Sequence, residues 1–155
     1  MVLSHSATFV DDVGAELDAG SEMTGETDLA TLLASLSPRQ DDTEWVFATV
    51  QKADATLLSP HAIASFREEE GLTLVLPQSE TGDLDHVSAP MIRIILEVHS
   101  SLEAVGLTAA VAGALASKGI SANVVAAYYH DHIFVPKASA EKALAILQAL
   151  STPTH

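Results

Sequence analysis

Residues 91–150 carry the pattern that most constrains the fold of this chain. Apolar residues recur first at every second position and then at helical spacing, and both periods return after a short turn. In chain order, the expected elements are a strand at 91–98, a helix at 100–119, strands at 120–128 and 132–136 around a turn at 129–131, and a helix at 139–150. This βαββα order places the end of a strand against the start of a helix at 100–106, where unpaired N–H groups can hold a small ligand.

Both ends of the first of these helices carry recognisable signals. Ser100 is a candidate N-cap, and Glu103 follows it at the spacing of a capping box. Gly119 occupies the position of a helix-ending glycine, directly after Lys118. We therefore expect the helix to begin at Ser100 and to end at Gly119.

Residues 25–88 resemble a weaker version of the same unit. Thr27 or Asp28 can cap a short helix, which Ser37-Pro38 ends. After it come a strand at 44–51, a short helix or turn at 54–60, strands at 61–67 and 72–77, and a polar connection at 78–88. Because a lone three-stranded unit has exposed edges, we expect the halves to extend one another's sheet. The predicted fold is an α+β ferredoxin-like sandwich with antiparallel sheets and helices packed on one face.

The chain has a formal net charge of −14, and its seven Lys and Arg residues are scattered along it. Phosphate binding needs several basic residues on one face, so we expect neither nucleic acid nor a membrane surface as a partner. Residues 1–44 hold ten acidic residues and one basic residue, and we interpret 1–24 as a flexible acidic segment. The lack of Cys, of a signal-peptide pattern and of a membrane-spanning apolar run predicts a cytoplasmic protein.

Several stretches resemble the ACT-domain family of small-molecule-binding regulatory modules. The segments IILEVHSSLEAVGLTAAVAGALASKGISANVV (94–125) and AAYYHDHIFVP (126–136) match the family's strand, glycine-containing loop, helix and Gly-Ile step into the next strand. Together with 25–38 and 65–77, they are similar to small stand-alone proteins that have two ACT-like units and no enzyme domain.

This resemblance implies a division into units and a class of ligand. It implies a degenerate ACT-like unit at 25–88 and a second ACT-like unit at 89–151. Members of the wider family bind amino acids at interfaces between units, but the resemblance to the stand-alone proteins does not carry over a ligand. A full ACT unit ends with a fourth strand, and the residues after Leu150 do not supply one. That strand has to come from elsewhere in the chain or be missing.

The candidate ligand site is the start of the helix in the second unit. The N–H groups there carry a partial positive charge and would take the carboxylate of a ligand. The residues assigned to this site are Ser100, Ser101, Leu102, Glu103, Ala104, Val105 and Gly106. Asn123, in the next strand, would read the ligand's amino group through its amide. The alternative is a closed helix start that Ser100 and Glu103 cap, with Asn123 in an interface.

His130 and His132 suggest an alternative metal site, because residues at positions i and i+2 of a strand point the same way. Such a site needs a third ligand, for which His99, Glu103 or Asp131 is available. The chain contains no motif of nucleophilic catalysis and no phosphate-binding loop.

We therefore expect a regulatory or sensing protein that binds a small molecule, an amino acid, without catalytic activity or cofactor. Homo-oligomers through sheet edges or helix faces are expected as well. Two alternatives remain open: a structural or partner-binding oligomerisation module without a ligand, and a small metal-dependent enzyme that uses His130 and His132.

Overall fold

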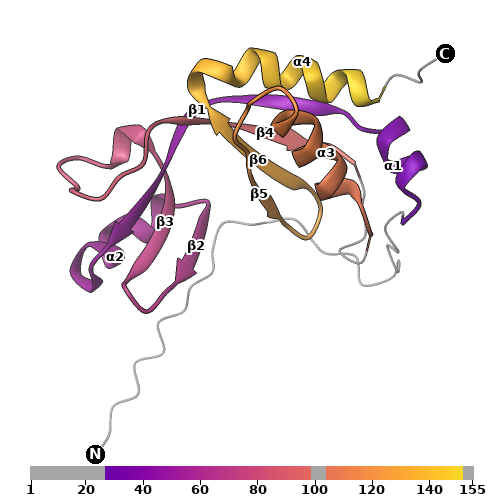
Figure 1. Ribbon diagram of the computed structural model, residues 1–155. Helices are drawn as coiled ribbons and strands as arrows, with labels where there is room; N and C mark the ends of the chain where they lie inside the picture. Colours follow the sequence, from indigo (N-terminus) through magenta and orange to yellow (C-terminus); the bar gives the residue numbers. More distant parts are fainter. Residues whose placement is uncertain (1–26, 99–103, 152–155) are drawn as a thin grey trace, which may run out of the picture.

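The computed structural model describes residues 27–98 and 104–151, which form a six-stranded sheet with helices packed against it (Figure 1). Neighbouring strands are antiparallel, in the order β2-β3-β1-β4-β6-β5. The strands are β1 (Pro38–Val50), β2 (Ala64–Arg67), β3 (Leu72–Pro77), β4 (Met91–Leu96), β5 (Asn123–Ala126) and β6 (Asp131–Pro136). The helices are α1 (Leu29–Ala34), α2 (Lys52–Leu58), α3 (Leu107–Ala116) and α4 (Ala140–Leu150), with 3-10 turns at Ser59–His61, Gln78–Glu80 and Lys137–Ser139. The predicted α+β ferredoxin-like class is confirmed, and the two predicted sheets are joined into one.

Strand β1 joins the two halves of the chain. Its residues up to Trp45 pair with β4, and its residues from Trp45 onward pair with β3. Beside β4 it stands where the fourth strand of the second unit is expected, so the first unit supplies that strand. The sequence pattern placed this strand at 44–51, but it begins at Pro38. The pattern missed 38–43 because these residues are mostly polar and carry no apolar alternation.

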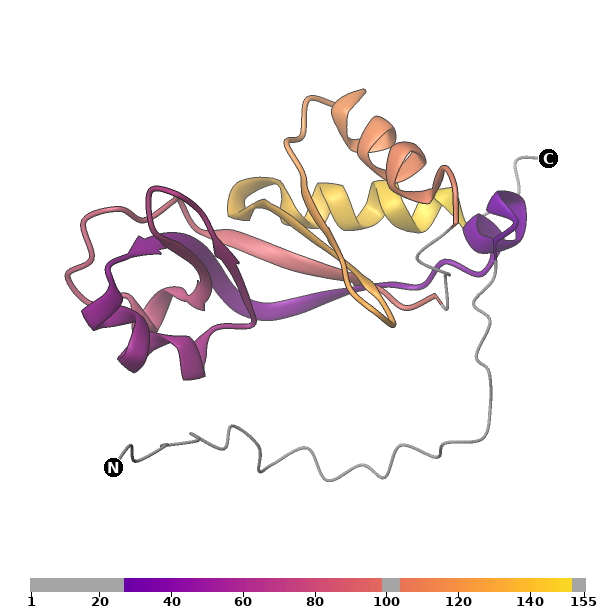
Figure 2. The same ribbon diagram turned by 90° about the horizontal axis from the view of Figure 1, so that it is seen from below.

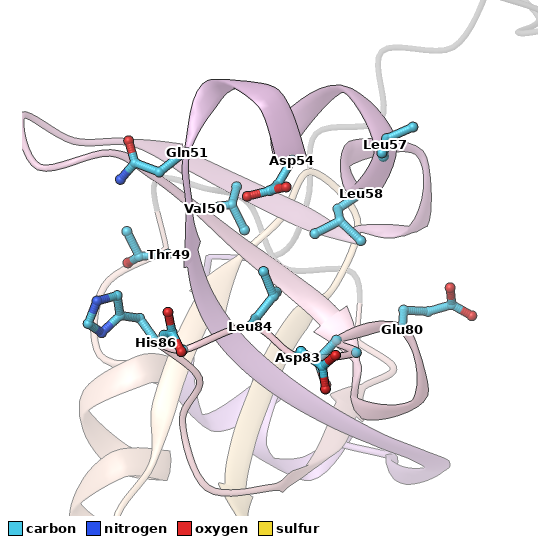
Figure 3. A pocket seen from close by; sticks show the side chains of 13 residues that line it. Thr49, Val50, Gln51, Asp54, Leu57, Leu58, Glu80, Asp83, Leu84 and His86 are labelled. Atoms are coloured by element: carbon cyan, nitrogen blue, oxygen red, sulfur yellow. The ribbon is translucent and has the colours of Figure 1, made fainter.

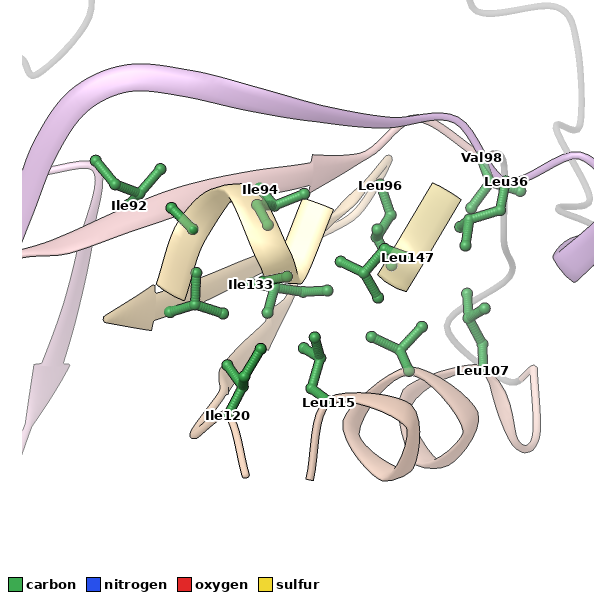
Figure 4. Packing of buried hydrophobic residues seen from close by; sticks show 14 of the residues in the cluster. Leu36, Ile92, Ile94, Leu96, Val98, Leu107, Leu115, Ile120, Ile133 and Leu147 are labelled. Atoms are coloured by element: carbon green, nitrogen blue, oxygen red, sulfur yellow. The ribbon is translucent and has the colours of Figure 1, made fainter. Parts of the chain in front are cut away.

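The largest apolar cluster lies between the second unit's strands and helices α3 and α4 (Figure 4). Ile94 of β4 and Ile133 of β6 are fully buried on the helix side of the sheet. Leu115 of α3 and Leu147 of α4 pack onto them, and Leu32 of α1 closes one end of the cluster. Because burying one such side chain contributes about 1.5–3 kcal/mol, this cluster is the main source of stability for the second unit.

A smaller cluster lies between β1, β3 and α2. It contains Val46, Ala48 and Val50 from β1, against which the first unit's short helix packs. Glu44 pairs with Ile92 across β1 and β4, so alternation puts Val46 on the same side of the sheet as Ile92. Both clusters therefore lie on one face of the sheet, as the sequence predicts.

Helix α3 begins seven residues later than the sequence pattern indicates, at Leu107 rather than at Ser100. Its N-cap is Gly106, whose backbone is left-handed with φ 102°, and Ala104 and Val105 before it are not helical. The predicted capping box of Ser100 and Glu103 is therefore wrong for this helix, and both residues lie outside the described ranges. The sequence predicts the start of this helix too early because Ser100 and Glu103 have the spacing of a capping box.

The C-terminal end of α3 has the predicted geometry. Gly119 is left-handed with φ 71°, and its N–H donates to the carbonyl of Ala116 at 2.9 Å. The N–H of Ile120 reaches back to the carbonyl of Leu115 at 3.1 Å, and both side chains are buried in the same cluster. This pair of bonds with its apolar contact is a Schellman motif, which explains the glycine at this position.

Two glycine substitutions in this region should have opposite effects on stability. Gly119→Ala should lower the free energy of unfolding by about 1–2 kcal/mol, because an L side chain resists the left-handed backbone. Gly113→Ala, in the exposed interior of α3 with open space around it, should raise it by about 0.5–1 kcal/mol. Urea unfolding of the two variants measures both values. Equal effects from the two substitutions would contradict the assigned helix end.

Candidate functional site

The predicted ligand residues fall partly within the described chain. Ser100, Ser101, Leu102 and Glu103 lie outside the described ranges, whereas Ala104, Val105 and Gly106 lead directly into α3. Val105 is 83% exposed, and no side chain of the described residues caps the helix start. A Cβ on Gly106 would stand 3.0 Å from Cδ2 of Leu29, so the glycine also permits α1 to pack closely here. Helix α1 therefore packs beside the start of α3 (Figure 2).

The structure does not bring Asn123 to this helix start within one chain. Asn123 is the first residue of β5 and lies across from Phe134, at the end of the strand where β4 begins. Its neighbour Val124 packs into the helix-side cluster, so Asn123 points to the opposite face of the sheet. Its amide nitrogen lies 3.5 Å from the sulfur of Met91.

Asp131, in contrast, lies at the end of the sheet where β4 stops, before the chain continues toward α3. The sequence pattern assigns it to the turn at 129–131, but it is the first residue of β6 and only 6% exposed. It pairs with Leu96, the last residue of β4, and alternates with Ile133, so its side chain is directed toward the helix face. Burial raises the pKa of the Asp131 carboxyl, and the charge of His130 opposes that effect. The sequence does hold a signal for its burial, because Asp131 lies two residues before Ile133 and four before Val135, both of which are buried in β6.

The alternative metal site gains no support from the geometry. No group of three His, Cys, Asp or Glu residues that could hold a metal occurs within 27–98 and 104–151. His132 points to the face opposite the helices, since it lies between Ile133 and Asp131 in the alternation of β6. Burial lowers the pKa of His132, and the charges of Arg93 and His130 lower it further.

The face of the sheet opposite the helices carries an aromatic cluster around one ion pair. Trp45 and Phe134 are almost fully buried there, and the ring of Phe134 meets that of Phe47 edge-on at 5.3 Å. The guanidinium of Arg93 lies 5.0 Å above the centre of the Trp45 ring. Arg93 Nη2 also contacts Oδ2 of Asp41 at 2.6 Å, and both side chains are mostly shielded from water.

Asp41 occupies the irregularity in β1 where the register shifts between Gln40 and Glu44. Its carboxylate accepts the N–H of Thr43 at 3.1 Å, Nε1 of Trp45 at 2.9 Å and Nε of Arg93 at 2.9 Å. Burial pushes the pKa of Asp41 upward, but these hydrogen bonds and the Arg93 charge outweigh it and hold the pKa below its ordinary value. The cluster therefore fixes a bulge in β1 to the middle of β4.

A cleft of about 460 Å³ opens at the strand-to-helix junction of the first unit (Figure 3). Its lining comes from the end of β1, from α2 and from the loop at 80–86, which lies in the polar connection that the sequence predicts at 78–88. Val50, Leu58 and Leu84 form its apolar side. Its polar side is formed by Asp54, Glu80, Asp83, Asp85 and His86.

Two backbone contacts hold the cleft's loop to β1. The N–H of Thr49 donates to the carbonyl of His86 at 3.1 Å, and the N–H of Ser88 donates to the carbonyl of Phe47 at 2.9 Å. By chain order, β1 followed by α2 in the first unit corresponds to β4 followed by α3 in the second. The cleft therefore occupies the position in the first unit that the sequence predicts for the ligand in the second.

Comparison with known protein families accounts for both halves of the chain. An ACT-domain family model matches residues 24–85, and a second ACT-domain model matches residues 90–149. The chain belongs to the ACT-domain family. ACT domains are regulatory modules that bind small molecules, which agrees with the class expected from the sequence. No curated protein matches the chain.

Solved structures share the arrangement of this ACT protein. A Vibrio cholerae protein of unknown function, described as a possible transport protein, is 49% identical, with a TM-score of 0.71 over 80% of this chain and 96% of that one. An Agrobacterium tumefaciens protein is 18% identical, with a TM-score of 0.62 over 75% and 89% of the two chains. The ligand-free regulatory subunit of aspartate kinase from Thermus thermophilus is 9% identical, with a TM-score of 0.56 over 75% and 97%. The last two likenesses concern the fold alone.

The helices of this ACT protein are short. Across the part of the chain that the structure describes, none has both the length and the apolar character needed to cross a membrane.

Removal of the shielded ion pair should destabilise the protein more than removal of an exposed one. Arg93→Met should cost about 2 kcal/mol, because it leaves Asp41 shielded from water without its charge partner. Arg39→Met is the matched control: its ion pair with Glu97 is exposed, so the cost should stay below about 0.5 kcal/mol. Trp45 is the single Trp of the chain, so its fluorescence follows urea unfolding in both variants. Similar costs for the two variants would show that the cluster does not secure the β1–β4 register.

Proposed function

We propose that this ACT protein is a cytoplasmic regulatory or sensing protein that binds an amino acid and has no catalytic activity of its own. The family matches at 24–85 and 90–149 support a division close to 25–88 and 89–151, and they occupy most of the chain. Regulation in this proposal means that ligand binding favours one arrangement of the two units over another.

The observation that carries the proposal is the cleft at the end of β1. Its volume of about 460 Å³ lies within the range of ligand sites, roughly 300–1,000 Å³. Its lining combines an apolar side with four carboxylate side chains, which would attract the amino group of a ligand. Thr49 and Val50 belong both to the lining and to the strand that pairs with β4 nearer its start. A ligand here would therefore contact the one strand that both units share.

The equivalent junction of the second unit is the other proposed site. The N–H groups at the start of α3 would take the ligand's carboxylate, with Ala104, Val105 and Gly106 beside them. Ser100, Ser101, Leu102 and Glu103 complete the set proposed from sequence. Because Asn123 lies on the other face of the sheet, it would take part in this proposal only from a second copy of the chain.

Self-association is therefore part of the proposal. Strands β2 and β5 are the outer strands of the described sheet, and each has one edge without a neighbouring strand. A homo-oligomer formed through these edges would provide interfaces between units of different copies.

One observation favours a second candidate function, a module that assembles without a ligand. Leu57 is 74% exposed, and Ile63 and Phe66, at and beside the outer strand β2, are 42% and 43% exposed. Apolar side chains next to a free strand edge suit association with another chain.

A thermal-shift series with the twenty amino acids separates these two functions. A ligand present at about 100 times its Kd stabilises the folded protein by about 2.7 kcal/mol, which for a chain of this size raises Tm by roughly 10 °C. We expect at least one amino acid to produce such a shift. If no amino acid moves Tm while Leu57→Ser or Phe66→Ser changes the oligomeric state, the assembly module is the better account.

A charge placed beside the start of α3 tests the second-unit site. Val105→Asp should weaken binding of the amino acid found in that series at least about tenfold, because the new carboxylate repels the ligand's own. Val105 is 83% exposed, so the fold should tolerate the change, and Val105→Thr serves as the uncharged control. Isothermal titration calorimetry measures both affinities. Unchanged affinity in Val105→Asp, together with weaker binding in Asp54→Asn, would move the site to the cleft of the first unit.

A further inference from the structure

Strand β2 is an outer strand of the described sheet, and three of its four residues are exposed (Figure 1). The N–H of Glu68 donates to the carbonyl of Gly71 at 2.9 Å and closes the β2–β3 hairpin. Because the bonds of an antiparallel ladder occur at alternate residues, those toward β3 fall two and four residues before Glu68. The N–H and C=O groups of Ser65 and Arg67 therefore point away from β3, along the free edge.

Exposed apolar side chains accompany this edge. Phe66 is 43% exposed and follows Ala64 by two residues, so it lies on the face of the sheet opposite the helices. Ile63, just before β2, and Leu57 of α2 are exposed as well. Half of the large apolar side chains that are exposed in the described chain thus occur within 57–66. An edge that only has to avoid aggregation is protected by charge, so these apolar groups indicate a surface that another chain covers.

Exposed carboxylates stand at both ends of β2. Residues 68–70, which follow the strand, are all Glu. Glu80 lies near its other end, where Oε2 is 3.5 Å from Nδ1 of His61 in the turn that leads into β2. The strand itself contains one basic residue, Arg67. The edge therefore combines outward-pointing main-chain groups and apolar side chains with negative charge at each end.

The negative charge selects among possible occupants of this edge. A second copy that paired antiparallel through β2 would bring the Glu residues at 68–70 of each copy beside the start of β2 in the other, where Glu80 lies. Like charges that face one another across a strand pair are destabilising. The formal net charge of −14 also disfavours nucleic acid and anionic membrane. An extended segment that alternates apolar residues with Lys or Arg is complementary to the edge in all three respects.

We infer that the free edge of β2 binds an extended, basic segment of another protein, which joins the sheet as an added strand. The main-chain groups of Ser65 and Arg67 pair with this strand, Phe66 contacts its apolar side chains, and the carboxylates at 68–70 bind its Lys or Arg residues. The inference rests on the proposed function, because both candidate functions require the chain to act through another chain. The edge of β5 (Asn123–Ala126) is uncharged and stays available for a second copy.

The test uses three short, terminally blocked and fluorescently labelled peptides of equal length. The probe alternates Lys and Val, one control alternates Glu and Val, and a second control alternates Lys and Pro. The Lys–Pro peptide has the charge of the probe but cannot form a strand ladder. Wild-type protein should bind the Lys–Val peptide at least about tenfold more tightly than either control, as fluorescence anisotropy at constant salt measures. If the Lys–Pro peptide binds equally well, charge alone attracts these peptides and no strand is added.

The decisive variant is Ser65→Pro, which removes an N–H that points away from β3 and which an edge strand tolerates. It should weaken binding of the Lys–Val peptide about tenfold, the loss expected for one hydrogen bond. Ala126→Pro is the matched control, because Ala126 has the equivalent outward position in β5 and should leave the affinity unchanged. Should Ser65→Pro not fold by Trp45 fluorescence, the exposed double variant Glu69→Lys/Glu70→Lys provides the test, since it should weaken Lys–Val binding and strengthen Glu–Val binding.

The outcomes separate this inference from the proposed function. If Ser65→Pro binds the Lys–Val peptide as tightly as wild type does, the edge of β2 is not the binding surface and the inference is wrong. If light scattering shows that Ser65→Pro splits a wild-type oligomer, a second copy occupies the edge, which also overturns the inference. A thermal shift with an amino acid but no Lys–Val binding leaves amino-acid sensing intact and removes only the partner surface. Lys–Val binding without any such shift removes the amino acid and keeps the partner surface.

Discussion

The pairing of β1 with β4 is the interaction on which the rest of the structure depends. Each unit contributes only three strands, and this ladder makes them one sheet, across which Trp45 of the first unit packs with Phe134 of the second. The register of this ladder is set at a bulge in β1. There the carboxylate of Asp41 accepts a hydrogen bond from Thr43 of its own strand and one from the guanidinium of Arg93 in β4. A one-residue shift of β1 relative to β4 would move Val46 to the face opposite α2. The same shift would move Trp45 to the helix side of the sheet. The ion pair therefore contributes register as well as stability.

The shared strand also explains how two units could communicate. β1 continues beyond its pairing with β4 and, paired with β3, ends at the cleft of the first unit, whereas β4 ends at the opposite end of their shared ladder, beside Pro38. In the proposed function, a ligand in the cleft would contact the far end of the strand that pairs with β4. Packed sheets respond to such local changes by switching between discrete arrangements rather than by gradual deformation. A ligand that bound both arrangements equally well would shift nothing, so the contacts must differ between them.

Two titratable residues of β6, Asp131 and His132, lower the stability of the second unit because their side chains are removed from water. Asp131 is buried on the helix side and His132 is partly buried on the opposite side, and burial favours the neutral form of both. A unit selected only for stability would hold apolar residues at these positions, as it does at Ile133 and Val135.

Local sequence signals predict three parts of the second unit correctly: the apolar periodicity of β4, that of α4, and the left-handed Gly119 after α3. Four features depend instead on contacts between distant parts of the chain: the start of α3, the extension of β1 to Pro38, the position of Asp131 in β6 and the cleft beside 80–86. Polar residues in 38–43 form a strand because β4 offers hydrogen-bond partners, and Asp131 belongs to β6 because it pairs with Leu96 of β4. Periodicity reports which side of an element is apolar, whereas partners that come from distant parts of the chain leave no local signal.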